Sequence, residues 1–251
     1  MNPPINAPRS ASSKGLVIAF IGFAILFAGF TALGVWQVQR LFWKLDLIEQ
    51  VETRVGAAPV VAPAPSTPVT AADDQYRHVR VIGTFDHSKE VLSMAVTEMG
   101  PGFWVLTPLM TDQGFSVLIN RGFVAPEFSD PATRPDGQVE GVQTVAGLLR
   151  ISEPEGGFMR SNDPVADKWY SRDVAAMAKA RQLDGTVAPY FIDADASDQV
   201  WPRGGMTVIK FTNHHLVYAL TWFGLAGMSI FGYWLVRREH RRRQTRPNES
   251  E

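Results

Sequence analysis

The chain has 251 residues, and its 24 Lys and Arg side chains nearly balance its 25 Asp and Glu, giving a net charge of −1. It contains no cysteine. This excludes disulfides, thiolate zinc sites, iron–sulfur clusters, blue-copper centres and covalently attached c-type haem. A domain of this chain in an oxidising compartment must therefore be stabilised by its hydrophobic core alone.

The first predicted element is a membrane-spanning helix at residues 15–38, preceded by a short tail at 1–14. The segment has no charged residue, and about 24 residues at 1.5 Å each reach roughly 36 Å, enough to cross a hydrocarbon core of about 30 Å. A cleaved signal peptide is the alternative, because Arg9 and Lys14 precede the apolar run. Signal peptides have apolar cores of only about 7–15 residues, and no A-x-A cleavage site follows. We therefore interpret the segment as an anchor.

The first span leads into a predicted helical stalk at 39–56, ending at Gly56. Apolar residues recur there at nearly helical spacing, at Leu41, Leu45, Ile48 and Val55. Residues 57–72 come next and hold four prolines between Pro59 and Pro68. Prolines at this density exclude helix and predict an extended linker.

The remaining core, residues 73–213, is predicted to be β-rich. Candidate strands are 76–85, 90–96, 103–110, 115–124, 144–151, 189–195 and 206–212. A turn at 111–114 indicates a hairpin between its two flanking strands. One short helix interrupts the strands, with Ser171 as the expected N-cap and Gly185 as the end. The extracytoplasmic domain, 39–215, is thus predicted to be α+β, with an antiparallel sheet or small barrel.

A second membrane-spanning helix is predicted at 216–236, followed by a basic tail at 237–251. The tail arginines are Arg237, Arg238, Arg241, Arg242, Arg243 and Arg246. Basic flanks stay on the cytoplasmic side, so we expect both termini in the cytoplasm and the domain in the periplasm. The N-terminal tail lacks the Arg-rich amphipathic pattern of a transit peptide. This favours the bacterial cytoplasmic (inner) membrane over the mitochondrial inner membrane.

Small residues recur at helical spacing in both spans. They are Ala24, Ala28 and Ala32 in the first, and Gly224 and Gly232 in the second. Such spacing permits close approach of helices, either of the two spans to each other or of each span to a partner. Chance occurrence in Ala- and Gly-rich segments explains it equally well.

The sequence carries no recognisable catalytic motif, so no enzyme is predicted. It lacks the phosphate-binding G-x-x-x-x-G-K-[ST] and G-x-G-x-x-G, the G-x-S-x-G elbow and the H-E-x-x-H metal motif. The acidic pair Asp193 and Asp195 is interpreted as turn or solvated strand-end residues. A soft copper site at His87, Met94 and Met99 is a minor alternative to structural roles for these residues.

The residues at the outer membrane interface are more informative. His215, Tyr218 and Trp222 are spaced i, i+3 and i+7 and share one helix face. At the same depth the first span offers Trp36 and Arg40, followed by Trp43. An imidazole, aromatic walls and a guanidinium would suit haem, as axial ligand, apolar packing and partner of the propionates. Aromatic and snorkelling residues are also ordinary at membrane interfaces, so the spacing alone leaves both readings open.

An ordered set of motifs resembles a known family. The first span ends in LGVWQVQRLFWK, and the second begins with NHHLVYALTWFGLA. Between them lie YRHVRVIGTFDH, GFWVLTPL, VLINRGFVAPE and WYSRDV. This set, over about residues 33–236, resembles the Surfeit-locus-one family of cytochrome c oxidase assembly proteins, known in yeast as Shy-one.

The resemblance implies a non-catalytic assembly factor for haem-copper cytochrome c oxidase. It implies binding of non-covalent haem a and help with its insertion into subunit I, with haem a synthase, subunit I and membrane lipid as partners and no nucleic acid. The family's N-x-H-L motif corresponds to residues 213–216, which gives His215 the role of axial iron ligand and leaves His214 as a competitor. Gly83 and Phe85 match the family's G-x-F, where glycine would allow close backbone packing.

The resemblance also extends to the other predicted haem contacts. They are Trp36 and Arg40 in the first span and Tyr218 and Trp222 in the second. Gln37, Trp43, Lys44 and Thr221 match as well. The alternative function is a membrane scaffold that stabilises an oxidase intermediate through protein contacts without binding haem.

Overall fold

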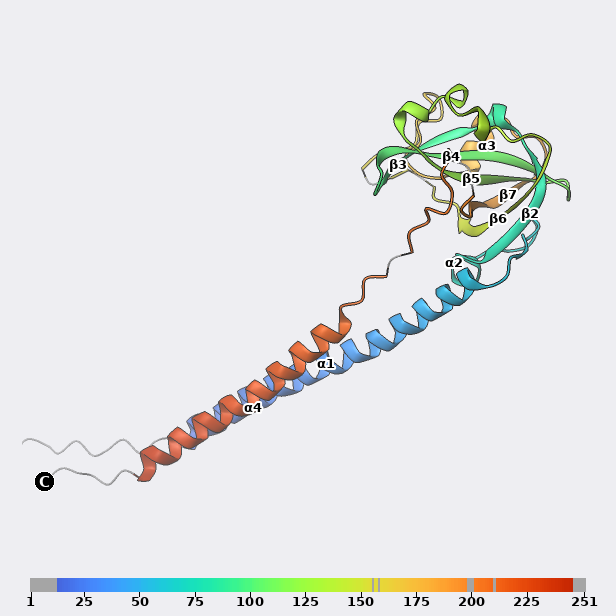
Figure 1. Ribbon diagram of the computed structural model, residues 1–251. Helices are drawn as coiled ribbons and strands as arrows, with labels where there is room; N and C mark the ends of the chain where they lie inside the picture. The colour runs from blue at the N-terminus through green and yellow to red at the C-terminus, as the bar shows by residue number, and fades with distance from the viewer. Residues whose placement is uncertain (1–12, 155, 158, 198–200, 210, 246–251) are drawn as a thin grey trace, which may run out of the picture. The chain divides into compact units, whose positions relative to one another are not determined.

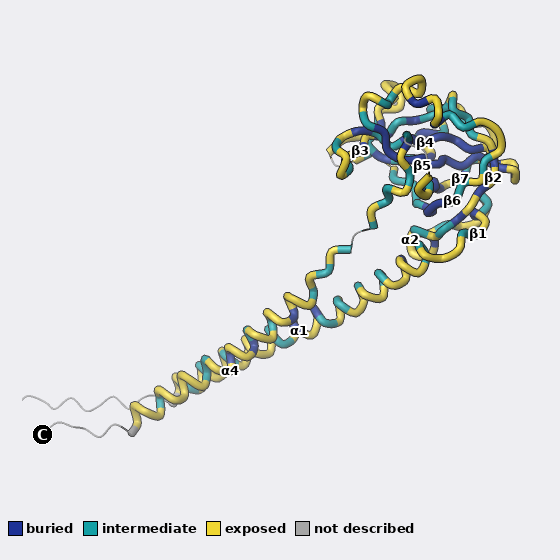
Figure 2. The backbone as a smooth tube through the Cα atoms, viewed as in Figure 1, coloured by how far each residue is buried: buried dark blue, intermediate teal, exposed yellow. Residues whose placement is uncertain are grey.

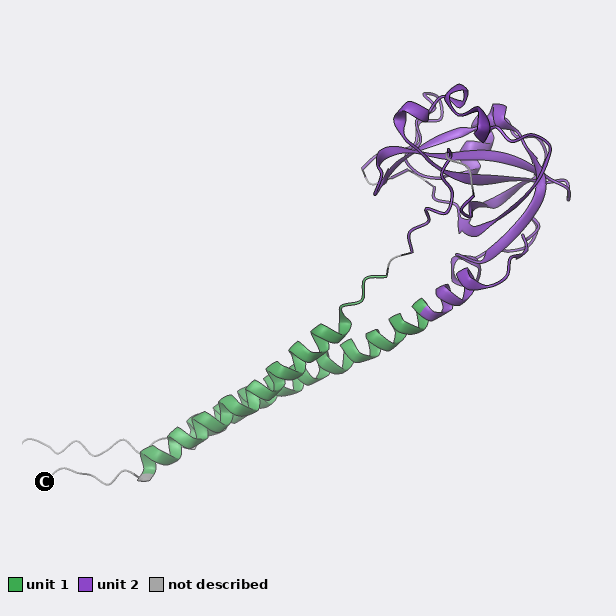
Figure 3. Cartoon of the chain, viewed as in Figure 1, with its two compact units in different colours: residues 1–48, 211–251 green, residues 49–210 purple. Residues whose placement is uncertain are grey.

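The computed structural model describes residues 13–154, 156–157, 159–197, 201–209 and 211–245. Arg9, Lys210 and Arg246, which belong to the predicted basic tails and last strand, lie outside these residues. The chain divides into two compact units (Figure 3). We call Met1–Ile48 with Phe211–Glu251 the helix unit, and Glu49–Lys210 the barrel unit. Each is described by itself.

Two long helices make up the helix unit. Helix α1 spans Ser13–Gly56, its last turns belonging to the barrel unit, and α4 spans His215–Thr245. Both are long and apolar enough to cross a membrane. They run antiparallel (Figure 1), because residues with increasing sequence numbers along α1 contact residues with decreasing sequence numbers along α4. Both helices extend beyond the predicted spans at 15–38 and 216–236.

Small residues line the contact between α1 and α4, but of the predicted ones only Gly232 takes part. Gly34 on α1 and Ala219 and Ala226 on α4 are buried, and a Cβ at Gly34 would lie 2.6 Å from the Phe223 ring. The stripe of Ala24, Ala28 and Ala32 is exposed. Of the second-span pair, Gly232 approaches Phe23, whereas Gly224 has no neighbour within 4 Å. The helices thus meet along a different face of α1 from the one that the alanine spacing suggested.

The barrel unit is a sheet that closes on itself. Its strands are β1 (Val60–Val61), β2 (His78–Phe85), β3 (Val91–Thr97), β4 (Gly100–Thr111), β5 (Ser116–Val124), β6 (Val142–Ile151) and β7 (Val187–Ala194). The spatial order is β1-β2-β6-β7-β5-β4-β3, and an additional β2–β4 pairing closes the ring (Figure 1). The predicted β-rich α+β fold is confirmed. The sheet is mixed rather than purely antiparallel, because the β1–β2 and β5–β7 pairs are parallel.

Short helices connect the strands. They are the α-helices α2 (Ala71–Asp74) and α3 (Val174–Ala180), and the 3-10 turns η1 (His87–Lys89), η2 (Pro126–Phe128), η3 (Pro131–Thr133) and η4 (Pro135–Gly137). The cap of α3 differs from the prediction. Asp173, not Ser171, accepts the hydrogen bond from the Ala176 N–H, because the Ser171 hydroxyl donates instead to the carbonyl of Glu153.

Closure of the barrel depends on one glycine. In β2, buried Val79 and Val81 alternate with outward neighbours, as the sequence predicts. Gly83 continues the inward face and pairs with Thr111 of β4. A Cβ at this position would collide with the Met110 carbonyl oxygen. The glycine of the G-x-F motif therefore allows the close backbone approach on which the β2–β4 contact depends.

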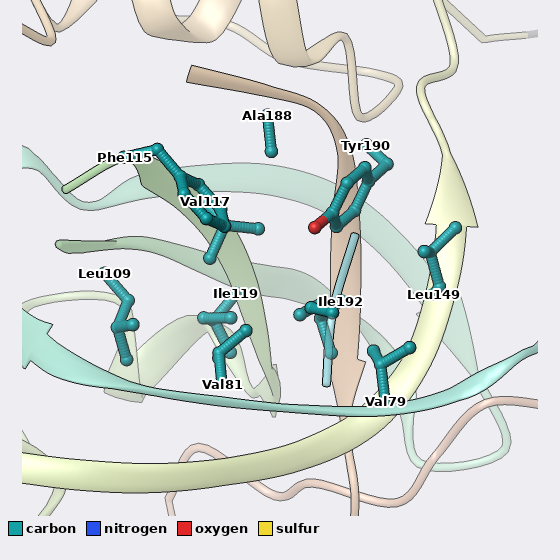
Figure 4. Close-up of a cluster of buried hydrophobic side chains, with 11 residues drawn as sticks. Val79, Val81, Leu109, Phe115, Val117, Ile119, Leu149, Ala188, Tyr190 and Ile192 are labelled. Atoms are coloured by element: carbon teal, nitrogen blue, oxygen red, sulfur yellow. The ribbon is translucent and has the colours of Figure 1, made fainter. Parts of the chain in front are cut away.

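Two apolar clusters occupy the two faces of the sheet. The barrel interior holds Val79, Val81, Leu109, Phe115, Val117, Ile119, Leu149, Ala188, Tyr190 and Ile192 (Figure 4). The second cluster lies under α3 and consists of Val91, Leu106, Leu118, Trp169, Val174, Met177 and Phe191. Successive residues of β5 and β7 enter opposite clusters, so both strands are buried on both faces (Figure 2).

Two segments predicted at the edges of the core differ in structure. The Pro-rich segment 57–72 is not a free linker: Val60 pairs with Val79, Ala62 is buried in the barrel cluster, and the Tyr190 hydroxyl donates to the Pro63 carbonyl at 2.6 Å. Residues 206–209 of the predicted strand 206–212 form no strand. Thr207 instead donates to Asp193 at 3.0 Å, which holds this segment by a side chain rather than by a backbone ladder.

Candidate functional site

The candidate site lies where the C-terminal part of the first span, in α1, meets the start of α4. Helix α4 begins at His215, whose backbone N–H donates to the Asn213 side chain at 3.4 Å. No proline or charged residue interrupts α4 from there to Val236. The helix start therefore fixes the imidazole at the end of an uninterrupted apolar segment.

The central contact joins His215 to Gln37. The imidazole Nδ1 lies 2.7 Å from the Gln37 Oε1. An amide oxygen can only accept a hydrogen bond, so Nδ1 carries the proton and the lone pair is on Nε2. Gln37 is only 9% exposed, and an amide at this depth between apolar helices needs such a partner. The pair is thus a polar contact between the two helices that also selects the tautomer of His215.

Aromatic rings continue the contact between the helices. Trp222 stacks on Phe30 at a centroid distance of 5.8 Å and an interplanar angle of 25°. Further along the pair, Tyr233 contacts Phe20 and Phe23 at 5.4 and 6.3 Å. His215 and Trp222 therefore both face α1.

The other predicted residues lie outside this contact. Trp36 and Tyr218 are 53% and 54% exposed. Arg40 is exposed and its guanidinium lies 3.7 Å from the centre of the Trp43 ring. His214 is exposed and precedes the helix. The structure thus joins His215 to Gln37 and Trp222 to Phe30, and it leaves Trp36, Arg40 and Tyr218 on the surface of the helix pair.

Helix geometry places these exposed residues on one flank. Relative to Gln37, Arg40 is rotated by about 60° and Trp36 by about 100° to the same side of α1, since successive residues turn by about 100°. Relative to His215, Tyr218 is rotated by about 60° on α4. Because the helices are antiparallel and face each other through Gln37 and His215, these rotations point to the same side of the pair. We call Trp36, Arg40 and Tyr218 the outer flank.

Sequence reasoning missed the partner of the histidine. Gln37 is among the residues that match the family motif, but the predicted face of the first span runs through Trp36 and Arg40. The available signal was that Gln37 is the one strongly polar side chain in an otherwise apolar run of 24 residues, at 15–38. An isolated amide in a span marks the face that contacts another helix.

The histidines of the barrel unit are structural. His87 has both ring nitrogens engaged, Nε2 with the Val139 carbonyl at 2.8 Å and Nδ1 with the Arg121 guanidinium at 3.4 Å. His87 is therefore not available as the imidazole ligand of the alternative copper site with Met94 and Met99. Among the described residues no group of three or more His, Cys, Asp or Glu side chains could hold a metal ion.

Two apolar helices that flank a small β-barrel define a membrane protein with one domain outside the lipid. The chain belongs to the SURF1 family, whose model matches residues 24–227. Surfeit locus protein 1 of Homo sapiens is 37% identical over 247 residues, covering 90% of this chain and 80% of the relative. The Rattus norvegicus protein of that name is 38% identical over 243 residues, covering 89% and 78%. A SURF1-like protein of Monosiga brevicollis is 32% identical over 248 residues, covering 93% and 92%.

The resemblance to the Surfeit-locus-one family is thereby confirmed. The match begins inside α1 and ends inside α4, so it includes His215, Gln37 and the outer flank.

Proposed function

We propose that this protein binds haem a at the outer end of its helix pair through His215 and assists its insertion into subunit I of cytochrome c oxidase. A role in cytochrome c oxidase assembly follows from membership of the SURF1 family, a family of assembly factors rather than enzymes. Haem a is cargo in this proposal, received from haem a synthase and passed on.

The observation that carries the proposal is the His215–Gln37 hydrogen bond of 2.7 Å. Histidines that ligate metals usually donate their second ring N–H to an oxygen, which fixes the ring and raises the basicity of the other nitrogen. Here Nδ1 makes that bond, and Nε2 has no partner among the described residues. This contact supports the proposal, because it orients the ring and, in the neutral imidazole, leaves the lone pair of Nε2 for a metal ion.

The outer flank supports the same proposal. A porphyrin needs apolar surfaces for its faces and a cation for its propionates. Trp36 and Tyr218 provide aromatic surface on the side of the pair to which Arg40 also points. Arg40, held over Trp43, provides the guanidinium. Trp222, about two turns beyond His215 on α4, is stacked on Phe30 and supports the helix contact below the imidazole.

The test is the haem content of the purified full-length protein from cells that make haem a. His215→Ala should lose most of the haem and its absorption spectrum, whereas His214→Ala, the matched control, should keep both. Gln37→Leu should retain the ligand but weaken binding by about 10–100-fold, the usual effect of removing an outer-shell partner. Unchanged haem content in His215→Ala would show that the ligand assignment is wrong.

A scaffold without haem is the second candidate, and the barrel surface favours it. The β3–β4 hairpin exposes Met94, Val96 and Met99 by 47%, 87% and 45%, next to each other on an edge of the sheet. Exposed apolar groups of this kind often mark protein contacts. In cells that lack the protein, a scaffold predicts full rescue of oxidase assembly by His215→Ala. The haem proposal predicts failure of that rescue.

We place the barrel unit in the periplasm of a bacterium and both termini in the cytoplasm. The support is the arginine-rich end of α4, where Arg238 lies 5.3 Å from the Trp234 ring centre at the interface. Because the chain lacks cysteine, a single Val165→Cys at a fully exposed position should react with a membrane-impermeant maleimide on whole spheroplasts. Protection of this cysteine until the cells are lysed would reverse the orientation.

A further inference from the structure

A cavity opens at one end of the barrel and is lined by residues of the barrel unit. Its volume is about 380 Å³, within the roughly 300–1,000 Å³ typical of small-molecule sites. Its lining includes Phe85 of β2, Ile119 of β5, Val145 of β6 and Ala194 of β7. These residues continue the inward-facing rows that form the barrel cluster. The cavity is therefore the mouth of the barrel, with an apolar floor made by its own core.

Arg121 lines the same cavity and is 6% exposed. It follows Val117 and Ile119 on the inward face of β5, so a cation occupies a position where the alternation calls for an apolar side chain. Its guanidinium lies 5.0 Å from the centre of the Phe85 ring. It donates to the Gly137 carbonyl and lies 3.4 Å from the His87 Nδ1.

Arg121 forms no ion pair with a described residue. The nearby buried pair joins Arg134 to Glu90 and leaves that carboxylate committed to another guanidinium. The pKa of Arg121 is lowered to about 10, chiefly by burial; attraction to Glu90 opposes this shift, and repulsion from Arg134 adds to it. A buried guanidinium whose direct hydrogen-bond acceptors are all neutral is costly and attracts an anion.

We propose that the barrel mouth binds a small carboxylate with an apolar body. The carboxylate would pair with the Arg121 guanidinium, whose planar fork matches it. The apolar part would contact Phe85, Ile119 and Val145 on the floor. Gln143 and Thr144 at the rim add neutral polar groups, while Asp195, also at the rim, is bonded to His78 at 2.8 Å.

The charge and polarity of the residues that line the cavity favour this class of ligand over an inorganic anion. One guanidinium supplies the charge, and the four floor residues Phe85, Ile119, Val145 and Ala194 are apolar. Phosphate carries more charge than one guanidinium balances, and it leaves the floor without a partner. A ligand with one carboxylate and a compact hydrocarbon part satisfies both the cation and the floor.

The experiment measures binding of benzoate to the full-length protein in neutral detergent at constant ionic strength, by titration calorimetry. Benzamide, the same ring without charge, and inorganic phosphate are the comparison probes. Wild-type protein should bind benzoate more tightly than either. Arg121→Gln should weaken benzoate binding by roughly tenfold or more, since the charge-assisted bidentate bond is lost. Arg80→Gln, on the outer face of β2, is the matched control and should bind like wild type.

A second variant guards against misfolding of Arg121→Gln. Gln143 is a partly buried residue at the rim, and its side-chain amide donates to the Glu140 carbonyl. Gln143→Glu keeps the shape of this side chain and places a negative charge at the mouth of the barrel. It should weaken benzoate binding several-fold and leave benzamide unaffected. The proposal is overturned if wild-type protein shows no benzoate binding, if benzamide or phosphate binds as well as benzoate, or if neither Arg121→Gln nor Gln143→Glu changes the affinity.

Discussion

The barrel unit and the helix unit use the same apolar residue types but pack them by different rules. In the barrel, large side chains face inward, and Val117 and Ile192 are 0% exposed. In the helix pair the buried positions include small residues such as Gly34 and Ala219, while large ones such as Ile18, 70% exposed, face outward. Water drives large apolar groups into a core, whereas lipid accepts them and leaves close packing to small residues.

The polar groups follow the same division. In the barrel, Asp193 is 3% exposed and contacts Arg150 at 2.6 Å, Asn120 at 2.7 Å and Arg172 at 3.4 Å. The described part of the helix contact has instead one polar pair between the helices, His215 with Gln37. Charges can be buried as a network in the barrel because several partners share the cost of desolvation. A span can hold one neutral pair at much lower cost.

The largest effect should come from breaking the barrel network. Asp193→Asn keeps the shape of the side chain but leaves Arg150 and Arg172 with only the more exposed Glu153 as a shared carboxylate, so the free energy of unfolding should fall by about 3 kcal/mol, the low end of the cost of breaking a buried ion pair. Urea unfolding of the full-length protein, followed by tryptophan fluorescence, measures this change. Asp112→Asn, on an exposed turn, is the control. A loss below about 1 kcal/mol would show that the network contributes little.

Closure of the barrel gives the next largest effect. Gly83→Ala places a methyl group against the Met110 carbonyl and the Leu109 side chain, so we expect a loss of about 1–3 kcal/mol in the same unfolding experiment. Thr84→Ala, the outward neighbour on β2, should change stability by less. Equal effects of the two substitutions would contradict a role of close backbone approach.

The helix contact should respond more weakly. Gly34→Leu pushes against Phe223 and should weaken association of the helices by about 1 kcal/mol, with the unfolding of the barrel unchanged. Cross-linking between Phe20→Cys and Tyr233→Cys, whose rings lie 5.4 Å apart in the native protein, reports the contact. Gly29→Leu, where no atom lies within 4 Å, should leave the yield intact. If Gly34→Leu and Gly29→Leu both abolish the cross-link, its yield depends on helix propensity or lipid rather than on the contact at Gly34.

The smallest effect concerns pH. Desolvation lowers the pKa of His78, but its bonds to the Ala57 carbonyl and to Asp195 outweigh this and raise the pKa above its usual value. The protonated form is therefore favoured by folding, and its stabilising contribution is complete below about pH 6.5 and lost as pH rises through the folded pKa. Unfolding midpoints measured across this range should fall slightly toward high pH in wild type but not in His78→Gln. The same pH dependence in both would assign it to another group.

The sequence predicts well where one physical rule dominates. Uninterrupted apolar runs revealed both spans, and the alternation around Val79 and Val81 revealed β2. The missed pairings depend on distant partners. Val60 and Val61 become a strand only because β2 offers its edge, and the proline density around them hid this. The parallel β5–β7 pair likewise joins segments that no local pattern relates.

The candidate site could be predicted only in part. Helical spacing identified the face of His215 and Trp222, but the rotation of α1 about its axis is set by packing at Gly34 and Gln37, which spacing does not reveal. Asp193 was interpreted as a solvated strand end, and its burial follows from the position of β7 between two other strands. Arg121 is hidden for the same reason, since its inward direction appears only once β5 is placed in the ring.

The place of β7 also has a consequence for the order of events during synthesis. It is the last strand among the residues that the structure describes, yet it lies between β6 and β5 in the ring. Until residues 187–194 have left the ribosome, β6 and β5 remain open edges, the kind of surface that invites pairing with other chains. Helix α4 begins soon afterwards at His215. Closure of the barrel and contact between the two helices therefore both wait for segments that are synthesised after β6.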